Sequence, residues 1–163
     1  MRSFAADIAE TLRDCGGIIL MPPHKKDARV YAPFLDYFAG WERERGIRCA
    51  TWDRAFIPDE KWLAAFRAES GGKRVGVALL RGLLPEMANA LEDAGMPLGT
   101  DSGIVYVSTG EDVLMEPNGV SIMHFDNYTL GRRAARLLMG VVDRGRDDAG
   151  RPENLIIPAA QQG

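Results

Sequence analysis

The stretch Val75-Gly-Val-Ala-Leu-Leu80 is an uninterrupted apolar run, as is typical of a strand covered on both of its faces. Residues 83–94 follow with apolar side chains at helical spacing, and Gly95 ends that pattern. A second apolar run, Gly103-Ile-Val-Tyr-Val107, comes next. Strand, helix and strand in this order predict a βαβ unit, which decides the fold class because its two strands lie parallel in one sheet.

The same alternation continues on both sides of this unit. Ile18-Ile-Leu-Met21 reads as a buried strand stopped by Pro22-Pro23, and residues 144–153 read as a charged loop. We therefore expect an α/β fold, a doubly wound and mostly parallel sheet with helices on both faces, formed by one domain of residues 1–163. Further helices are predicted at 5–14, 31–45, 58–69 and about 129–143, and further strands at 47–52, 120–125 and 155–157.

The composition of the chain argues against several classes of function. The 163 residues are 46% apolar and 26% charged, with a net charge of −3, so the chain lacks the basic excess of a nucleic-acid-binding protein. Cys15 and Cys49 are its two cysteines, without a metal-ligand spacing, which favours a reducing cytoplasm. No apolar run is long enough for a membrane span. We expect a cytoplasmic protein without a metal ion, cofactor or membrane partner.

The end of the chain carries a composite pattern. Pro117 and Val120-Ser-Ile122 precede Leu130-Gly-Arg-Arg-Ala-Ala-Arg-Leu-Leu138, and Gly95-Met96 begins a turn that continues through Leu98, Gly99 and Asp101. In this order, these residues resemble the C-terminal part of the effector-binding domain of LacI/GalR-type transcription regulators, which has the fold of type I periplasmic-binding proteins.

This resemblance implies a function. The domain would bind a small carbohydrate-like effector (a sugar, sugar acid or sugar phosphate), form a homodimer and perform no covalent chemistry. DNA would be bound only through a helix-turn-helix module that these residues do not include, and most of the N-terminal subdomain is also missing from them. The resemblance further implies that the helices at 5–14 and 129–143 pack against that subdomain. We therefore expect their apolar faces to be covered by a missing part of the protein or by a second copy.

Candidate ligand-binding residues come from the fold and from the resemblance together. Ligands of doubly wound sheets bind at the carboxyl ends of the strands. Trp52 and Asp53 follow one predicted strand, Arg81 follows another, and Ser108 follows a third. Trp52 would stack on a sugar ring, and Arg81 would suit an acidic or phosphorylated ligand. The resemblance places the effector-clamping arginine near Tyr37, with Arg29 as the nearest basic residue.

Other interpretations remain open. Arg81 can equally be a solvated residue at a helix entry, and Trp52 can belong to the core. The chain can also be a solute-binding or sensor module of the same fold without DNA binding. A degenerate receiver-like signalling domain is a further alternative, although Asp53 follows the second strand rather than the third. The phosphate-loop, dinucleotide and nucleophile-elbow motifs of common enzymes are missing from the sequence, so we expect no enzyme.

Overall fold

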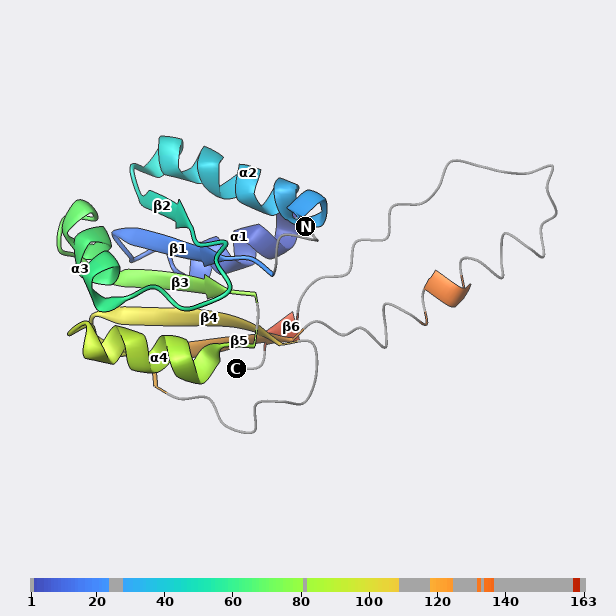
Figure 1. Cartoon of the computed structure of the whole chain (residues 1–163). Coiled ribbons are helices and arrows are strands. Elements are labelled where there is room, and N and C mark those ends of the chain that lie inside the picture. Colours follow the sequence, from blue (N-terminus) through green and yellow to red (C-terminus); the bar gives the residue numbers. More distant parts are fainter. Residues whose placement is uncertain are drawn as a thin grey trace.

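The protein forms one parallel sheet with helices on both sides in a computed structural model (Figure 1). The structure describes residues 2–23, 28–80, 82–108 and 118–124, together with 132, 134–136 and 160–161. Within them, five parallel strands have the order β2-β1-β3-β4-β5, and the short β6 pairs antiparallel with β5. The elements are α1 (Arg2–Thr11), β1 (Gly17–Met21), α2 (Ala28–Arg45), β2 (Arg48–Thr51), α3 (Glu60–Glu69), β3 (Val75–Leu79), α4 (Leu84–Asp93), β4 (Ser102–Ser108), β5 (Val120–His124) and β6 (Ala160–Gln161). The predicted α/β fold class is confirmed.

Two separate cores lie on the two faces of the sheet. Alternate side chains of β1 point to opposite faces, so Ile18 contributes to one core and Ile19 to the other. The first core packs α1 and α2 against the sheet, and the second packs α3 and α4 against it. Each buried leucine or isoleucine stabilises the fold by about 1.5–3 kcal/mol. The sheet is therefore covered on both faces, as its uninterrupted apolar strands predicted.

The expectation that the first helix needs an absent subdomain is wrong. Ala5, Ile8 and Leu12 of α1 are almost completely buried. They belong to the same core as Leu20 and Val105, which are residues of the chain's own sheet. The helix has this position because its apolar residues recur every three or four residues and form one stripe facing the strands.

Several element boundaries differ from the predicted ones. Helix α2 starts at Ala28, three residues before the predicted start, so Pro33 lies inside the helix. The predicted strand at 155–157 lies outside the described residues, and β6 is formed by Ala160 and Gln161 instead. Most of the predicted helix at 129–143 also lies outside them. Residues 132 and 134–136 are helical and exposed, and this short segment lies apart from the sheet (Figure 1).

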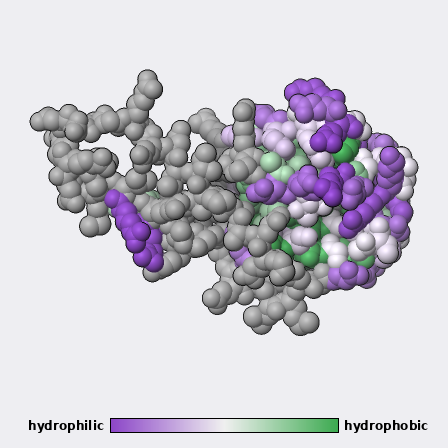
Figure 2. Space-filling model, turned by 180° about the vertical axis from the view of Figure 1, so that it is seen from behind, coloured by the Kyte–Doolittle hydropathy of each residue, from purple (hydrophilic) through white to green (hydrophobic). Residues whose placement is uncertain are grey.

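The described surface is mostly polar. Seen from behind, apolar residues show only as small patches among polar ones (Figure 2). Among the described residues, Phe56 is the large hydrophobic side chain that is exposed, at 63%. No helix within the described part of the chain combines the length and the apolar character that crossing a membrane requires.

Candidate functional site

The carboxyl ends of the parallel strands form the edge where this fold is expected to bind ligands. Strand β1 ends at Met21 and β3 at Leu79, and these two residues lie side by side in the register of the sheet. The chain passes from β1 to β2 on one side and then continues through β3 to β5 on the other. The strand order therefore reverses between β1 and β3, and crevices for ligands form at such a switch point.

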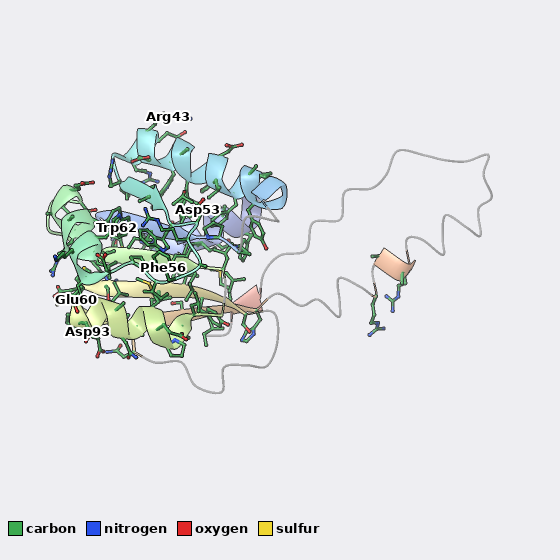
Figure 3. The ribbon with its side chains drawn as sticks, viewed as in Figure 1. Arg43, Asp53, Phe56, Glu60, Trp62 and Asp93 are labelled. Carbon is green, nitrogen blue, oxygen red and sulfur yellow. The ribbon has the colours of Figure 1, made fainter. Side chains whose placement is uncertain are left out.

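Three predicted site residues lie at this edge. Trp52 and Asp53 directly follow β2, and Ser108 is the last residue of β4. Ser108 is buried, whereas Asp53 is exposed in the connection after the strand (Figure 3). Arg81 itself lies outside the described residues, but Leu80 and Gly82 on either side of it follow the end of β3. Trp52 and Ser108, which are 56 positions apart in the sequence, thus lie at the same end of the parallel strands, with β1 and β3 between them.

The two predicted residues on α2 are placed differently. Arg29 is the second residue of that helix, and its side chain lies outside what the structure describes. Tyr37 lies eight residues after Arg29, about 12 Å further along the helix at 1.5 Å per residue. Its ring packs edge-on against Phe38 and lines a shallow depression of about 350 Å³ that residues of α2 form. The structure therefore does not bring Tyr37 to the ends of the strands.

Trp52 is enclosed rather than open to a ligand. Its side chain is 6% exposed, and its indole Nε1–H donates a hydrogen bond to the carbonyl oxygen of Phe56 at 2.7 Å. The Arg54 guanidinium lies 4.8 Å from the centre of the ring, and the Trp62 ring is also 4.8 Å away. Stacking of Trp52 on a sugar remains a prediction, and it would require the Arg54 side chain to move.

Sequence reasoning missed the aromatic cluster around Trp52, which consists of Trp52, Phe56, Trp62 and Phe66. Trp62 and Phe66 are stacked, with centroids 5.4 Å apart and an interplanar angle of 7°. The cluster forms because the connection from β2 to α3 folds back across the sheet face that α3 and α4 cover (Figure 1). The sequence signal that could have revealed this cluster is the alternation of Trp52, Arg54 and Phe56 directly after β2.

An acidic groove of about 560 Å³ lies between the start of α3 and α4, near this cluster. Its volume is in the usual range for small-molecule sites. Four carboxylates and one ammonium group line it, so sugar acids and sugar phosphates would be repelled from it. The charged lining residues are Asp59, Glu60, Lys61, Glu86 and Asp93, and Figure 3 shows Glu60 and Asp93 facing the same region.

The two thiols are poor nucleophiles. Burial raises the pKa of the Cys15 thiol above its ordinary value. Burial also raises the pKa of the Cys49 thiol to about 12, and the Glu42 carboxylate adds to this shift. Both side chains are therefore protonated near neutral pH, whereas a reactive cysteine needs its thiolate. The described residues contain no group of histidine, cysteine and acidic side chains that could hold a metal ion.

Comparison of the chain with protein-family models and with curated proteins finds no match. The likeness to LacI/GalR-type domains therefore depends on the sequence patterns quoted above. The strand order shows a doubly wound α/β fold.

Proposed function

We propose that this chain is the effector-binding and dimerisation part of a LacI-type transcription regulator. The observation that carries this proposal is that Trp52, Asp53 and Ser108 all lie at the carboxyl ends of parallel strands, in a sheet whose strand order reverses between β1 and β3. Leu80 and Gly82, which flank Arg81, lie at the same edge. The patterns near the end of the chain support the same assignment, because they resemble the last strand and helix of such domains.

On this proposal, the effector is a small carbohydrate-like molecule. The Asp53 carboxylate would accept hydrogen bonds from sugar hydroxyls, and Arg81 would bind a carboxylate or phosphate group of the ligand. The acidic groove beside α4 is unsuited to such an anion, which favours the carboxyl edge instead. Effector binding would shift a dimer between two conformations in the cytoplasm, and a DNA-binding module outside this chain would respond to the shift.

The dimerisation part of the proposal depends on the segment after β5. The apolar stripe of α1 is buried within the chain and provides no argument for a second copy. Ala134 and Ala135 are exposed on the short helical segment that the structure describes. Sedimentation velocity at several protein concentrations tests this part. A strictly monomeric species at all concentrations would count against it.

A ligand screen tests the effector. Sugars, sugar acids and sugar phosphates are each added to the protein, and the melting temperature is measured. A ligand at 100 times its Kd stabilises the folded state by about 2.7 kcal/mol, which raises Tm by several degrees in a domain of this size. Calorimetric titration then measures the affinity of each active compound. If no compound of the three classes raises Tm, the proposal has lost its main support.

Matched variants locate the site. Arg81→Gln should weaken the binding of an acidic or phosphorylated effector at least tenfold, because a charge-assisted pair is lost. Arg43→Gln removes the same charge from the exposed outer face of α2 and should leave the affinity unchanged (Figure 3). Equal effects of both variants would indicate a nonspecific loss of charge instead of a contact at the carboxyl edge.

A receiver-like phosphoacceptor domain is the second candidate, because receivers share the strand order 2-1-3-4-5. Two features weigh against it. First, Asp53 follows β2, the outermost strand of the sheet, and not β3. Second, Pro22 and Pro23 follow β1, where a receiver carries acidic residues. Incubation with Mg²⁺ and acetyl phosphate, followed by intact-mass measurement, separates the two functions. An added phosphoryl group that disappears in Asp53→Asn would favour the receiver.

A further inference from the structure

Arg74 lies at the amino ends of the strands, at the edge of the sheet opposite the proposed effector site. It directly precedes β3, and its guanidinium lies against Gly103 of β4. The Arg74 Nη2 is 3.4 Å from the Ser102 carbonyl oxygen, which is a long hydrogen bond. The Arg74 Nε is buried and has no hydrogen-bond partner within the described part of the chain.

This arrangement leaves a charged group with unused donors. A guanidinium carries five N–H donors and cannot lose its proton near neutral pH. Among the described residues, the recorded ion pairs involve other arginines, and none joins Arg74 to a carboxylate. Arg74 as a whole is half-buried, but its Nε–H is removed from the surface, and a buried donor without a partner destabilises the fold, so a partner for this N–H is expected.

A small pocket beside Arg74 offers room for that partner. Its volume is about 110 Å³, close to that of three or four water molecules at roughly 30 Å³ each. Hydroxyl groups of two lining residues add polar character, and none of the lining residues is acidic. The pocket is lined by Thr11, Leu12, Arg74, Gly103, Ile104, Gly119, Val120 and Ser121.

We infer that this pocket binds a small oxyanion, a phosphate or carboxylate group, through the guanidinium of Arg74. Arginine is suited to this role because its planar donors match two oxygens of such a group at once. Gly103 leaves room for this guanidinium, because a Cβ atom at this position would lie 2.7 Å from the Arg74 Nη2 and would displace it. The inference does not depend on the proposed effector site, which lies at the other edge of the sheet.

A structural explanation of Arg74 makes a different prediction. The end of α1 contributes Thr11 and Leu12 to the same pocket, and the carboxyl end of a helix carries a partial negative charge. If Arg74 served only to neutralise this charge, then added oxyanions would not affect it. Measurements with and without oxyanions therefore separate the two roles.

The test compares inorganic phosphate, acetate and chloride at equal pH and ionic strength. With phosphate or acetate at about ten times its Kd, the wild-type Tm should exceed the value in chloride by about 3 °C. A response to phosphate alone narrows the ligand to phosphate groups, and a response to acetate alone narrows it to carboxylates. Calorimetric titration with the active anion checks that one anion binds per chain.

Variants exclude a general salt effect, because phosphate stabilises many proteins by exclusion from their surface. Arg74→Met should lose the oxyanion-dependent rise in Tm, and Arg43→Met should retain it. Gly103→Ala keeps the charge but displaces the guanidinium, so it should weaken anion binding at least fivefold, and it provides the test if Arg74→Met does not fold. An equal rise in wild type and Arg74→Met, or no rise beyond chloride, would overturn the inference.

Discussion

The indole Nε1–H of Trp52 donates a hydrogen bond of 2.7 Å to the carbonyl oxygen of Phe56. This bond joins the end of β2 to a residue four positions later, and the Trp62 ring packs against the same indole. The connection between β2 and α3 is thereby fixed over one face of the sheet. Trp52 thus organises the loop next to the proposed site, whether or not it also contacts a ligand.

Replacing Trp52 by phenylalanine should destabilise the protein by about 1–3 kcal/mol. Phenylalanine keeps an aromatic ring in the cluster but removes the donor, so the Phe56 carbonyl loses its partner. Urea unfolding followed by far-UV circular dichroism measures the change in the free energy of unfolding. The variant should remain folded, since most of the apolar contacts are retained.

Phe56→Ala is the matched control for this prediction. It removes a side chain that is 63% exposed but retains the carbonyl that accepts the hydrogen bond. We expect a loss of about 0.5 kcal/mol, because the mostly exposed ring gives up its edge-on contact with the Trp52 ring. If Phe56→Ala destabilised the protein as much as Trp52→Phe, side-chain packing rather than the hydrogen bond would hold the loop.

Ile8→Ala should destabilise the protein by about 2–4 kcal/mol. Ile8 is completely buried in α1 against the sheet, so the substitution removes apolar contacts and leaves a cavity. Thr11→Ala, on the exposed side of the same helix, is the control and should change stability by less than about 0.5 kcal/mol. Chemical unfolding measures both. If Ile8→Ala lowered the free energy of unfolding as little as Thr11→Ala does, α1 would not be held against the sheet in solution.

The sequence predicted the strands well because each is a short apolar run between clear breaks, as at β1 and β3. Helix boundaries were less accurate. Pro33 suggested a start near residue 31, but α2 starts at Ala28, since packing of the helix against the sheet outweighs the unfavourable proline. The burial of α1 within the chain was predicted incorrectly because periodicity shows which face of a helix is apolar but not what covers it.

The candidate site was predictable only in part. Trp52, Asp53 and Ser108 were placed correctly because parallel topology fixes where strands end. The roles of Arg54 and Phe56 depend on how the connection after β2 folds back over the sheet, and local sequence carries little information about such a path. Arg74 was also missed, since its environment is built by β4 and by the end of α1, which are distant in sequence.

Gly17→Ala should destabilise the protein by more than about 2 kcal/mol. A Cβ atom at Gly17 would lie 2.1 Å from the Ser70 Oγ and 2.9 Å from a ring carbon of Phe66. Both neighbours are buried, so relief of the clash requires a shift of the loop after α3 or of β1 itself. Thermal and urea unfolding measure the loss.

Gly40→Ala tests the same substitution where space is free. Gly40 lies inside α2, and a Cβ atom there meets nothing within 4 Å. Alanine has the higher helix propensity, so this variant should stabilise the protein by about 0.5–1 kcal/mol. We therefore expect Gly17→Ala to destabilise the protein and Gly40→Ala to stabilise it. A destabilising Gly40→Ala would mean that the outer face of α2 is covered in solution.

Cys49 gives the fold a dependence on alkaline pH. Its side chain is half-buried, its backbone N–H donates to the Glu42 Oε1 at 3.1 Å, and its thiol contacts the Ile47 carbonyl. Burial, together with the nearby carboxylate, raises the thiol pKa from 9.0 to about 12. The folded protein thus holds this proton more tightly than the unfolded chain. The resulting stability is fully present below pH 9.0 and is lost as the pH rises toward 12.

Cys49→Ser should therefore flatten the decline of stability at alkaline pH. Serine keeps a hydrogen-bonding group of similar size but does not titrate in this range. Between pH 8 and pH 10, the wild type should lose about 1 kcal/mol more free energy of unfolding than the variant. Urea unfolding at each pH measures this difference, and the thiolate absorbance of the folded protein provides an independent check. Parallel pH curves for the two proteins, or a thiolate signal that rises near pH 9, would show that Cys49 is open to solvent.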